Sequence, residues 1–175
     1  SGDTGKILLI NVAKMYWTDS VALKVQRSNI DGTGQEDLVA GLTVPNGIAI
    51  DMVAGKLYWA DSGTSRIQRS NLDGTGSEDL VTSGLTTPTG IALDLDAGKM
   101  YWVDKSAGTI KRANIDGTTV EILVTGLTTP VFIDLDLKAR KMYWTNDSAG
   151  KIHRADLDGL NGVEILTGLV NPRGI

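Results

Sequence analysis

The stretch Lys56-Leu57-Tyr58-Trp59-Ala60-Asp61 decides the fold, because close copies of it recur along the chain. Tyr-Trp pairs stand at residues 16–17, 58–59, 101–102 and 143–144, so successive tryptophans are 42, 43 and 42 residues apart. A lysine precedes each pair, and an arginine, an Asp-Gly pair and a proline follow it in the same order. All four tryptophans and all four prolines are repeat positions, so we infer four copies of one unit.

Each unit contains four short runs that favour β-strands. In the second unit they are residues 47–51, 56–61, 66–72 and 78–82, and Asp73-Gly74 separates the last two. Asp-Gly between two such runs predicts a hairpin, because glycine accepts the positive φ of the turn. No segment keeps a 3.6-residue apolar period, so we predict no helix. A repeat of this length with four strands is typical of a β-propeller blade.

The Tyr-Trp pair fits a blade, because adjacent strand residues point to opposite faces of their sheet. Tyr58 and Trp59 therefore require both faces to be covered, as they are between two neighbouring blades. If the next hairpin turns around residues 20–22, Val25 lies opposite Trp17 and Arg27 opposite Met15, with the arginine stem along the Trp face. Asp19 and Arg27 would then lie at opposite ends of the hairpin, and we expect no ion pair between them.

The repeated block resembles the YWTD repeat of the low-density lipoprotein receptor family. The motif residues, which we expect to be structural, are Tyr16, Trp17 and Asp19; Tyr58, Trp59 and Asp61; Tyr101, Trp102 and Asp104; and Tyr143, Trp144 and Asn146. The resemblance implies an all-β fold, a propeller of four-stranded antiparallel blades. The family ring has six blades, whereas this chain holds four.

We expect residues 1–175 to form a single propeller or propeller segment. The expected blades span about residues 5–44, 45–87, 88–129 and 130–171, and residues 172–175 begin a further strand. Lys6–Asn11 would fill the first-strand position of the first blade. Open faces at the two ends of a four-blade arc would be apolar and would allow self-association.

Composition excludes several functional classes. The chain has 175 residues, a net charge of −4 and no strong basic field, so nucleic acid is not an expected partner. Its apolar runs are too short for membrane insertion. It has no cysteine and one histidine, His153, which leaves almost no material for a thiolate site, a multi-histidine zinc site or a Ser-His-Asp triad. We expect no cofactor and no metal.

Several motifs imitate functional sites but have simpler interpretations. The motif acids each begin a tight turn, so we expect them to bond their own turn backbone. Asp94-x-Asp96 and Asp134-x-Asp136 resemble calcium ligands but lack a dedicated loop. The Asp-Gly-Thr-Gly segments join two strands, whereas phosphate loops lead into a helix. His153 aligns with Gln26, Gln68 and Lys111, and we expect an exposed polar residue there. Asn146-Asp147-Ser148 reads as a glycosylation sequon.

The fourth unit departs from the pattern. Phe132, the only phenylalanine, replaces a glycine, Arg140 replaces the turn glycine, and Asn146 replaces the motif aspartate. Phe132 would lie near the central axis, where it is either a packing variant or a ligand contact. We favour the packing variant.

The residue after each proline would ring the mouth of the central channel. These residues all differ from one another: they are Asn46, Thr89, Val131 and Arg173. A constant scaffold with variable mouth residues suits a binding platform. By resemblance, we expect a non-enzymatic extracellular or cell-surface module that binds a protein loop or peptide on this face. The alternatives are a hydrolase on a propeller scaffold, such as a metal-dependent lactonase, and a purely structural repeat protein.

Overall fold

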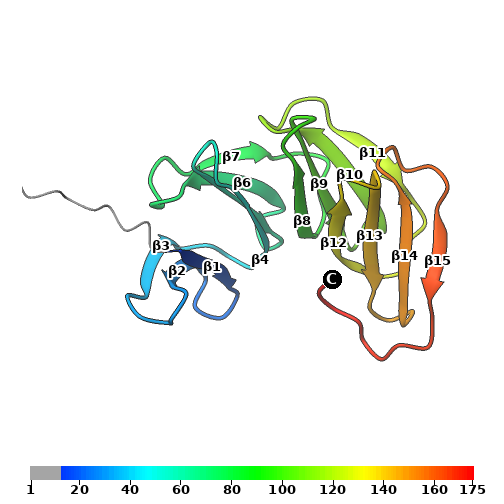
Figure 1. Ribbon diagram of the computed structural model, residues 1–175, viewed down its shortest axis with the longest axis horizontal. Coiled ribbons are helices and arrows are strands. Elements are labelled where there is room, and N and C mark those ends of the chain that lie inside the picture. The colour runs from blue at the N-terminus through cyan, green and yellow to red at the C-terminus, as the bar shows by residue number, and fades with distance from the viewer. Residues whose placement is uncertain (1–12) are drawn as a thin grey trace, which may run out of the picture.

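The computed structural model describes residues 13–175, and all regular structure in this range is β-strand (Figure 1). Blade one contains β1 (Lys14–Asp19), β2 (Lys24–Asn29) and β3 (Glu36–Ala40). Blade two contains β4 (Pro45–Asp51), β5 (Lys56–Asp61), β6 (Arg66–Asn71) and β7 (Glu78–Val81). Blade three contains β8 (Pro88–Asp94), β9 (Lys99–Asp104), β10 (Thr109–Asn114) and β11 (Glu121–Val124). Blade four contains β12 (Pro130–Asp136), β13 (Lys141–Asn146), β14 (Lys151–Asp156) and β15 (Val163–Leu166).

Strands that follow one another in the chain are neighbours within each antiparallel sheet. The predicted all-β propeller of antiparallel blades is therefore confirmed. Blades two to four have four strands, and the described part of blade one has three. The prediction that Lys6–Asn11 supply its first strand lies outside the described residues. Nowhere in residues 13–175 is there a helix of the length and hydropathy that a membrane span needs.

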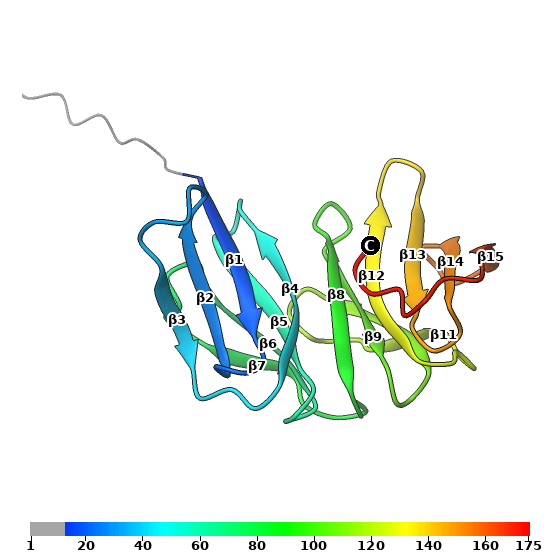
Figure 2. The same cartoon turned by 90° about the horizontal axis from the view of Figure 1, so that it is seen from below.

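The blades stand side by side in an arc, and their first strands form its inner side (Figures 1 and 2). Strand β8 contacts β4 on one side and β12 on the other. The long connections run from the outer strand of one blade to the inner strand of the next. This arrangement aligns equivalent residues of β4, β8 and β12 along the concave wall.

Blades two and three each bury a tyrosine on one face and a tryptophan on the other: Tyr58 and Trp59, and Tyr101 and Trp102. We call them the Trp face, which meets the preceding blade, and the Tyr face, which meets the following one. Between blades two and three, Tyr58 and Ala49 share a buried cluster with Trp102. Between blades three and four, Tyr101 packs in one cluster with Trp144. The prediction that Tyr-Trp pairs require two covered faces is confirmed at these two junctions.

The predicted register of the second hairpin is wrong. Trp17 lies opposite Gln26, and Arg27 lies opposite Tyr16, because the turn contains four residues, 20–23, with Leu23 at φ 60°. The arginine side chain therefore lies on the Tyr face of its blade and not on the Trp face. The guanidinium carbons of Arg69 and Arg112 lie 5.8 Å from the ring centres of Tyr58 and Tyr101 respectively, within the range of a cation–π contact.

The predicted absence of an ion pair between Asp19 and Arg27 agrees with the observed pairing. Asp19 lies opposite Lys24 at the turn end of the hairpin, while Arg27 is three residues further along β2. Arg27 instead pairs with Glu36 of β3 at 2.7 Å. The arginines thus bind across the outer half of their blade.

The Asp-Gly-Thr segments are hairpin turns, as predicted. Gly32 and Gly74 have φ of 82° and 84°, and the carboxylate of Asp31 accepts a bond from the backbone N–H of Thr33 at 2.9 Å. Both segments lead into a strand. They therefore lack the helix N-terminus whose amides hold a phosphate group.

Arginines join consecutive blades at the outer side of each junction. Arg27 donates from Nη1 to the carbonyl of Leu72 at 2.7 Å, Arg69 to that of Ile115 at 3.5 Å, and Arg112 to that of Leu157 at 3.2 Å. The acceptor is always the residue before the Asp-Gly turn of the next blade. One repeated residue therefore fixes both the hairpin of its own blade and the position of the next.

Candidate binding surface

The structure places three of the four predicted mouth residues at equivalent positions of the inner strands. Asn46, Thr89 and Val131 are the second residues of β4, β8 and β12, and Arg173 follows β15. Thr89 and Val131 are in direct contact, because the Thr89 hydroxyl donates to the Val131 carbonyl at 2.7 Å. These residues lie in one row along the wall.

Their side chains differ in how much they offer to a ligand. Thr89 and Val131 are buried, with 6% and 7% of their surface exposed, so they serve mainly the junction between blades. Asn46 is half-buried and donates from its amide to the Val44 carbonyl and the Ser62 hydroxyl. The Arg173 side chain is 70% exposed and reaches Asp147 at 3.3 Å. Asn46 and Arg173 are therefore the accessible members of the predicted set.

A hollow of about 400 Å³ opens beside Asn46 on the concave side of the arc. Its wall includes Tyr16, Trp17, Phe132 and the C-terminal Ile175. Of these, Phe132 was weighed as a ligand contact near the axis, although a packing variant was favoured. Tyr16 and Trp17 were assigned to the core by the motif, and Ile175 was not considered because the mouth rule selected only the residue after each proline.

A second hollow of about 430 Å³ lies further along the same wall, toward the other end of the inner strands. Ile50, Leu93 and Leu95 give it an apolar lining, and Asp96 and Asp134 add two carboxylates. Asp134 also borders the first hollow, so it is the acidic residue common to both. The concave wall is thus mainly aliphatic with a few acidic and aromatic side chains.

The motif aspartates fasten the connections between blades. Asp19 accepts bonds from the N–H groups of Val21 and Ala22 in its own turn, which confirms the predicted turn role and lowers its pKa. Asp61 accepts from its own turn and also from the N–H groups of Thr43 and Val44 at 3.0 and 2.9 Å. These two residues belong to the connection that enters blade two. The role is therefore structural and broader than predicted.

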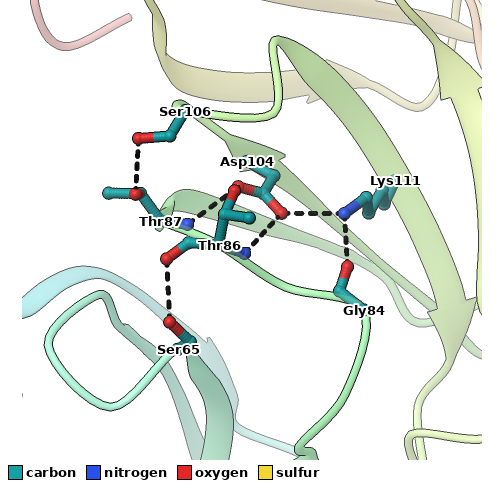
Figure 3. Close-up of polar contacts among 7 residues, drawn as sticks. All are labelled: Ser65, Gly84, Thr86, Thr87, Asp104, Ser106 and Lys111. Atoms are coloured by element: carbon teal, nitrogen blue, oxygen red, sulfur yellow. Dashed lines mark hydrogen bonds and ion pairs between the residues drawn. The ribbon is translucent and has the colours of Figure 1, made fainter.

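Asp104 holds the connection that enters blade three (Figure 3). It accepts from the N–H groups of Thr86 and Thr87 at 3.0 and 2.8 Å and from the Thr86 hydroxyl, and Lys111 donates to it at 2.7 Å. Unlike Asp19, it has no bond to its own turn among the described residues. Burial acts to raise the pKa of Asp104, but the hydrogen bonds from Lys111, Thr86 and Thr87 outweigh this effect. The pKa of the carboxyl is therefore lower than its ordinary value.

Lys111 belongs to a cross-strand position that differs between blades. In blades one and two the residue is a glutamine: Gln26 and Gln68 each accept from the indole N–H of the tryptophan opposite and donate to an aspartate on the outer strand. In blade three the outer residue is Ile122, and Lys111 bonds Asp104 and the Gly84 carbonyl instead. The indole N–H of Trp102 then has no partner among the described residues.

In blade four the same position holds His153, and the prediction of an exposed residue there is wrong. His153 is half-buried, and its ring stacks on Trp144 with the centres 5.4 Å apart. Desolvation lowers the pKa of His153, although Glu164 acts in the opposite direction. The slot faces the packed side of the blade in all four copies, since Gln26 and Lys111 are also buried. Alignment with polar residues was misleading because Gln26 and Lys111 are buried and Gln68 is half-buried.

The remaining polar motifs serve local structure. Asp94 caps its own turn by accepting from the Ala97 N–H at 3.0 Å, and Asp136 does the same with Ala139 at 2.8 Å. In the part of the chain that the structure describes, no three His, Cys, Asp or Glu side chains gather as a metal site would require. Asn146 is buried, so the folded chain does not offer this sequon to a glycosylating enzyme.

Comparison with protein families identifies the repeat. Residues 55–95 match the family described as low-density lipoprotein receptor repeat class B. The resemblance of the Tyr-Trp blocks to this family is thereby confirmed. No curated protein sequence matches the chain.

Solved structures share the architecture. The chain is similar to one in the crystal structure of a nidogen/laminin complex, with a TM-score of 0.86, 26% identity, and coverage of 93% of this chain and 64% of that one. It is also similar to virginiamycin B lyase from Staphylococcus aureus, with a TM-score of 0.71, 19% identity, and coverage of 88% and 52%. A streptogramin B lyase structure matches with a TM-score of 0.75, 18% identity, and coverage of 92% and 54%. The chain spans less than two thirds of each of these chains, and the lyase similarities concern the fold alone.

Proposed function

We propose that this arc of class B repeats is a protein-recognition module that binds a protein loop or peptide on its concave, mouth-side surface. The similarity to a structure of a nidogen/laminin complex is the observation that carries the proposal, because it concerns the same repeat in a setting of protein–protein contact. The proposal also places the protein outside the cell or at its surface, as for the receptors that give the repeat its name.

The accessible chemistry of the concave wall supports this function. Two half-buried side chains, one polar and one aromatic, border the hollow of about 400 Å³: Asn46 and Phe132. Aromatic residues dominate the energetic centres of protein interfaces because they bury large apolar areas at low entropic cost. Arg173 at the rim adds a charge that can select a partner and speed its encounter.

The test is a selection of peptides from a displayed random library on the immobilised 175-residue chain. Binding of the selected peptides is then measured for Asn46→Ala and Arg173→Ala. We expect each variant to weaken binding at least about tenfold, which corresponds to roughly 1.4 kcal/mol. Arg173→Ala should disturb the fold by no more than about 0.5 kcal/mol, because the side chain is exposed. Asn46→Ala should cost about 1 kcal/mol, because it removes the bonds to Val44 and Ser62, so its folding is checked by denaturation before binding is measured.

Arg66→Ala is the matched control, because Arg66 is a partly exposed cation whose partner, Asp79, lies on the outer strand of blade two. It should leave peptide affinity unchanged. If the selected peptides bind all the variants with equal affinity, or if only Arg66→Ala weakens binding, the mouth-side surface is not the site.

We propose no catalytic role. The lyases share the fold at 18–19% identity, which carries no argument about activity, and the one histidine of this chain packs against Trp144 and not into the concave wall. A purely structural repeat protein is the outcome if the selection yields no binder.

A further inference from the structure

The turn between β14 and β15, on the outer side of blade four (Figure 1), is held differently from the equivalent turns of the other blades. In those blades an asparagine at the end of one strand donates to a threonine hydroxyl within the turn. The pairs are Asn29–Thr33, Asn71–Thr75 and Asn114–Thr118, each at 2.9 Å. Blade four has Asp156 in place of that asparagine and Leu160 in place of the threonine. Its turn relies on Asn161, whose Nδ2 donates to Asp156 Oδ2 at 2.6 Å.

Asn161 is followed by Gly162, and this order of residues opens the side-chain amide to attack by the next backbone nitrogen. Glycine has no Cβ to hinder the approach. In the folded chain the N–H of Gly162 donates to no group among residues 13–175, and a Cβ atom added at Gly162 would meet nothing within 4 Å. Neither a hydrogen bond nor a crowded surrounding therefore restrains the Gly162 nitrogen.

Attack requires Asn161 to rotate out of its folded conformation, and few contacts oppose this rotation. The backbone hydrogen bonds of the turn end at Leu160, so within residues 13–175 the bond to Asp156 is the one that restrains Asn161. Asn161 also has φ of 55°, a left-handed conformation that is less favourable for asparagine than for glycine. Local opening of this segment should therefore be frequent.

The turn is open to water wherever a blade stands in the ring. Asn161 and Gly162 are both exposed. The residues equivalent to Asn161 in blades two and three are Gly76 and Thr119, and both are exposed although another blade follows each of them. A blade packed after blade four would therefore leave Asn161 accessible.

The same pair of residues occurs once more, at Asn46 and Gly47, in a different setting. It lies within β4, where the Asn46 amide donates to the Val44 carbonyl at 3.0 Å and to the Ser62 hydroxyl at 2.8 Å. A Cβ atom added at Gly47 would stand 2.6 Å from the Thr89 carbonyl oxygen, so this backbone is tightly packed against the next blade. The chain thus contains one loosely held Asn-Gly pair and one firmly held pair.

We propose that Asn161 is a site of spontaneous deamidation. The Gly162 nitrogen forms a bond to the Asn161 Cγ and gives up its proton to water, and the side-chain amide leaves as ammonia. Water then opens the resulting succinimide at either of its two carbonyl groups, which gives aspartate or isoaspartate at position 161. The reaction consumes one water, releases one ammonia and requires no enzyme.

Deamidation at this position changes the turn itself. The amide that donates to Asp156 becomes a carboxylate, so the hydrogen bond is replaced by repulsion between like charges. Isoaspartate also lengthens the backbone by one carbon just before Val163, where β15 begins to pair with β14. The reaction should therefore loosen the outer strand of blade four.

The test incubates the folded 175-residue chain at mildly alkaline pH and follows tryptic peptides by mass spectrometry. Trypsin releases residues 155–173 with Asn161 and residues 28–56 with Asn46. Deamidation should be at least about tenfold faster at Asn161, because reaction at Asn46 requires opening of a packed strand. Asn171 is an internal reference, since Pro172 has no N–H to attack it. Equal rates at Asn161 and Asn46 would overturn the proposal.

Gly162→Ala is the matched control, because it keeps Asn161 and its bond to Asp156. The φ of Gly162 lies outside the left-handed region and the space around it is free, so the fold should accept the methyl group. The Cβ hinders the attacking nitrogen and should slow deamidation of Asn161 at least about tenfold. An unchanged rate in this variant would show that Gly162 is not the attacking residue, and the proposal would be wrong.

Asn161→Asp tests the effect on the fold directly. It places the product carboxylate beside Asp156 and should lower the denaturant midpoint. Asn171→Asp is its control, because Asn171 is also exposed, also has a positive φ, of 48°, and adds the same charge away from Asp156. Equal midpoints for the two variants would overturn the proposed loosening of blade four.

Discussion

Lys111 lies 2.7 Å from Asp104, and both side chains are almost wholly excluded from solvent, at 6% and 0% exposure. The pair is not part of the repeat motif: the lysine occupies the position of a glutamine in blades one and two, beside an outer strand that carries Ile122 instead of an aspartate. Blade three has therefore replaced both members of the Gln–Asp pair together: Ile122 stands in place of the aspartate, and Lys111 bonds Asp104 instead.

Lys111→Met should destabilise the fold by about 3–5 kcal/mol, because it leaves the Asp104 carboxylate buried without its cation. The loss should lie toward the lower end, since Thr86 and Thr87 still donate to Asp104. Urea denaturation measures it. Lys24→Met is the control: its pair with Asp37 is exposed, and the cost should be at most about 1 kcal/mol. Equal losses would mean that the buried pair is energetically ordinary.

His153→Gln should stabilise blade four by about 1 kcal/mol, because a glutamine can accept from the buried indole N–H of Trp144, as Gln68 does from Trp59. Thermal denaturation at neutral pH measures this gain. Gln68→His is the reciprocal control and should lose a similar amount. A loss on His153→Gln would show that stacking of His153 on Trp144 matters more than the hydrogen bond.

The same substitution should remove a pH dependence. The pKa of His153 is lower in the folded chain than in the unfolded chain, so the unfolded chain binds more protons as the pH falls below the ordinary histidine range. Stability should therefore decline as the pH falls from about 7 toward 5. The slope in this window should be shallower in His153→Gln. An identical slope would assign the dependence to carboxylates.

Asp61→Asn should cost about 1–3 kcal/mol, because the carboxylate accepts from four backbone N–H groups and an amide has only one oxygen for them. Asn146→Asp is the matched change in the opposite direction: the Asn146 Oδ1 is buried without a partner in the described chain, and an aspartate can accept from the connection that enters blade four. We expect a gain in the denaturant midpoint. A loss would show that blade four has adapted to the amide.

Trp59→Ala should cost about 3–5 kcal/mol, as for other large aromatic residues removed from a packed core. Tyr143→Ala should cost less, because the Tyr143 side chain is only half-buried. Chemical denaturation of both variants measures the difference. Equal costs would mean that Tyr143 is packed as well as Trp59.

The fold was predictable because it depends on spacing. Four Tyr-Trp pairs at a constant interval required sheets with two covered faces, and the clusters around Trp102 and Trp144 confirm this. The hairpin register was not predictable to one residue, since nothing in the repeat itself tells a three-residue turn from the four-residue turn at 20–23. That single step moved Arg27 from the Trp face to the Tyr face.

The candidate surface was less predictable, because burial of a polar residue depends on its neighbours across blades. Thr89 was expected at the mouth, but its hydroxyl bonds the Val131 carbonyl of the next blade. For the same reason a substitution there should not be neutral. The overlooked signal is that the residue opposite the tryptophan varies together with its partner on the outer strand. The pairs are Gln with Asp in blades one and two, Lys with Ile in blade three and His with Glu in blade four.

The arginine contacts between blades have a consequence for how the chain acquires its structure. Each joins residues only 45 or 46 positions apart, about one repeat, and the three junctions within residues 13–175 all form between consecutive blades. Contacts of limited sequence separation allow stacked repeats to consolidate one after another. During synthesis, blade two can be secured as soon as blade three has left the ribosome. The central blades should then exchange their amide protons most slowly, and the outermost blades should fray first.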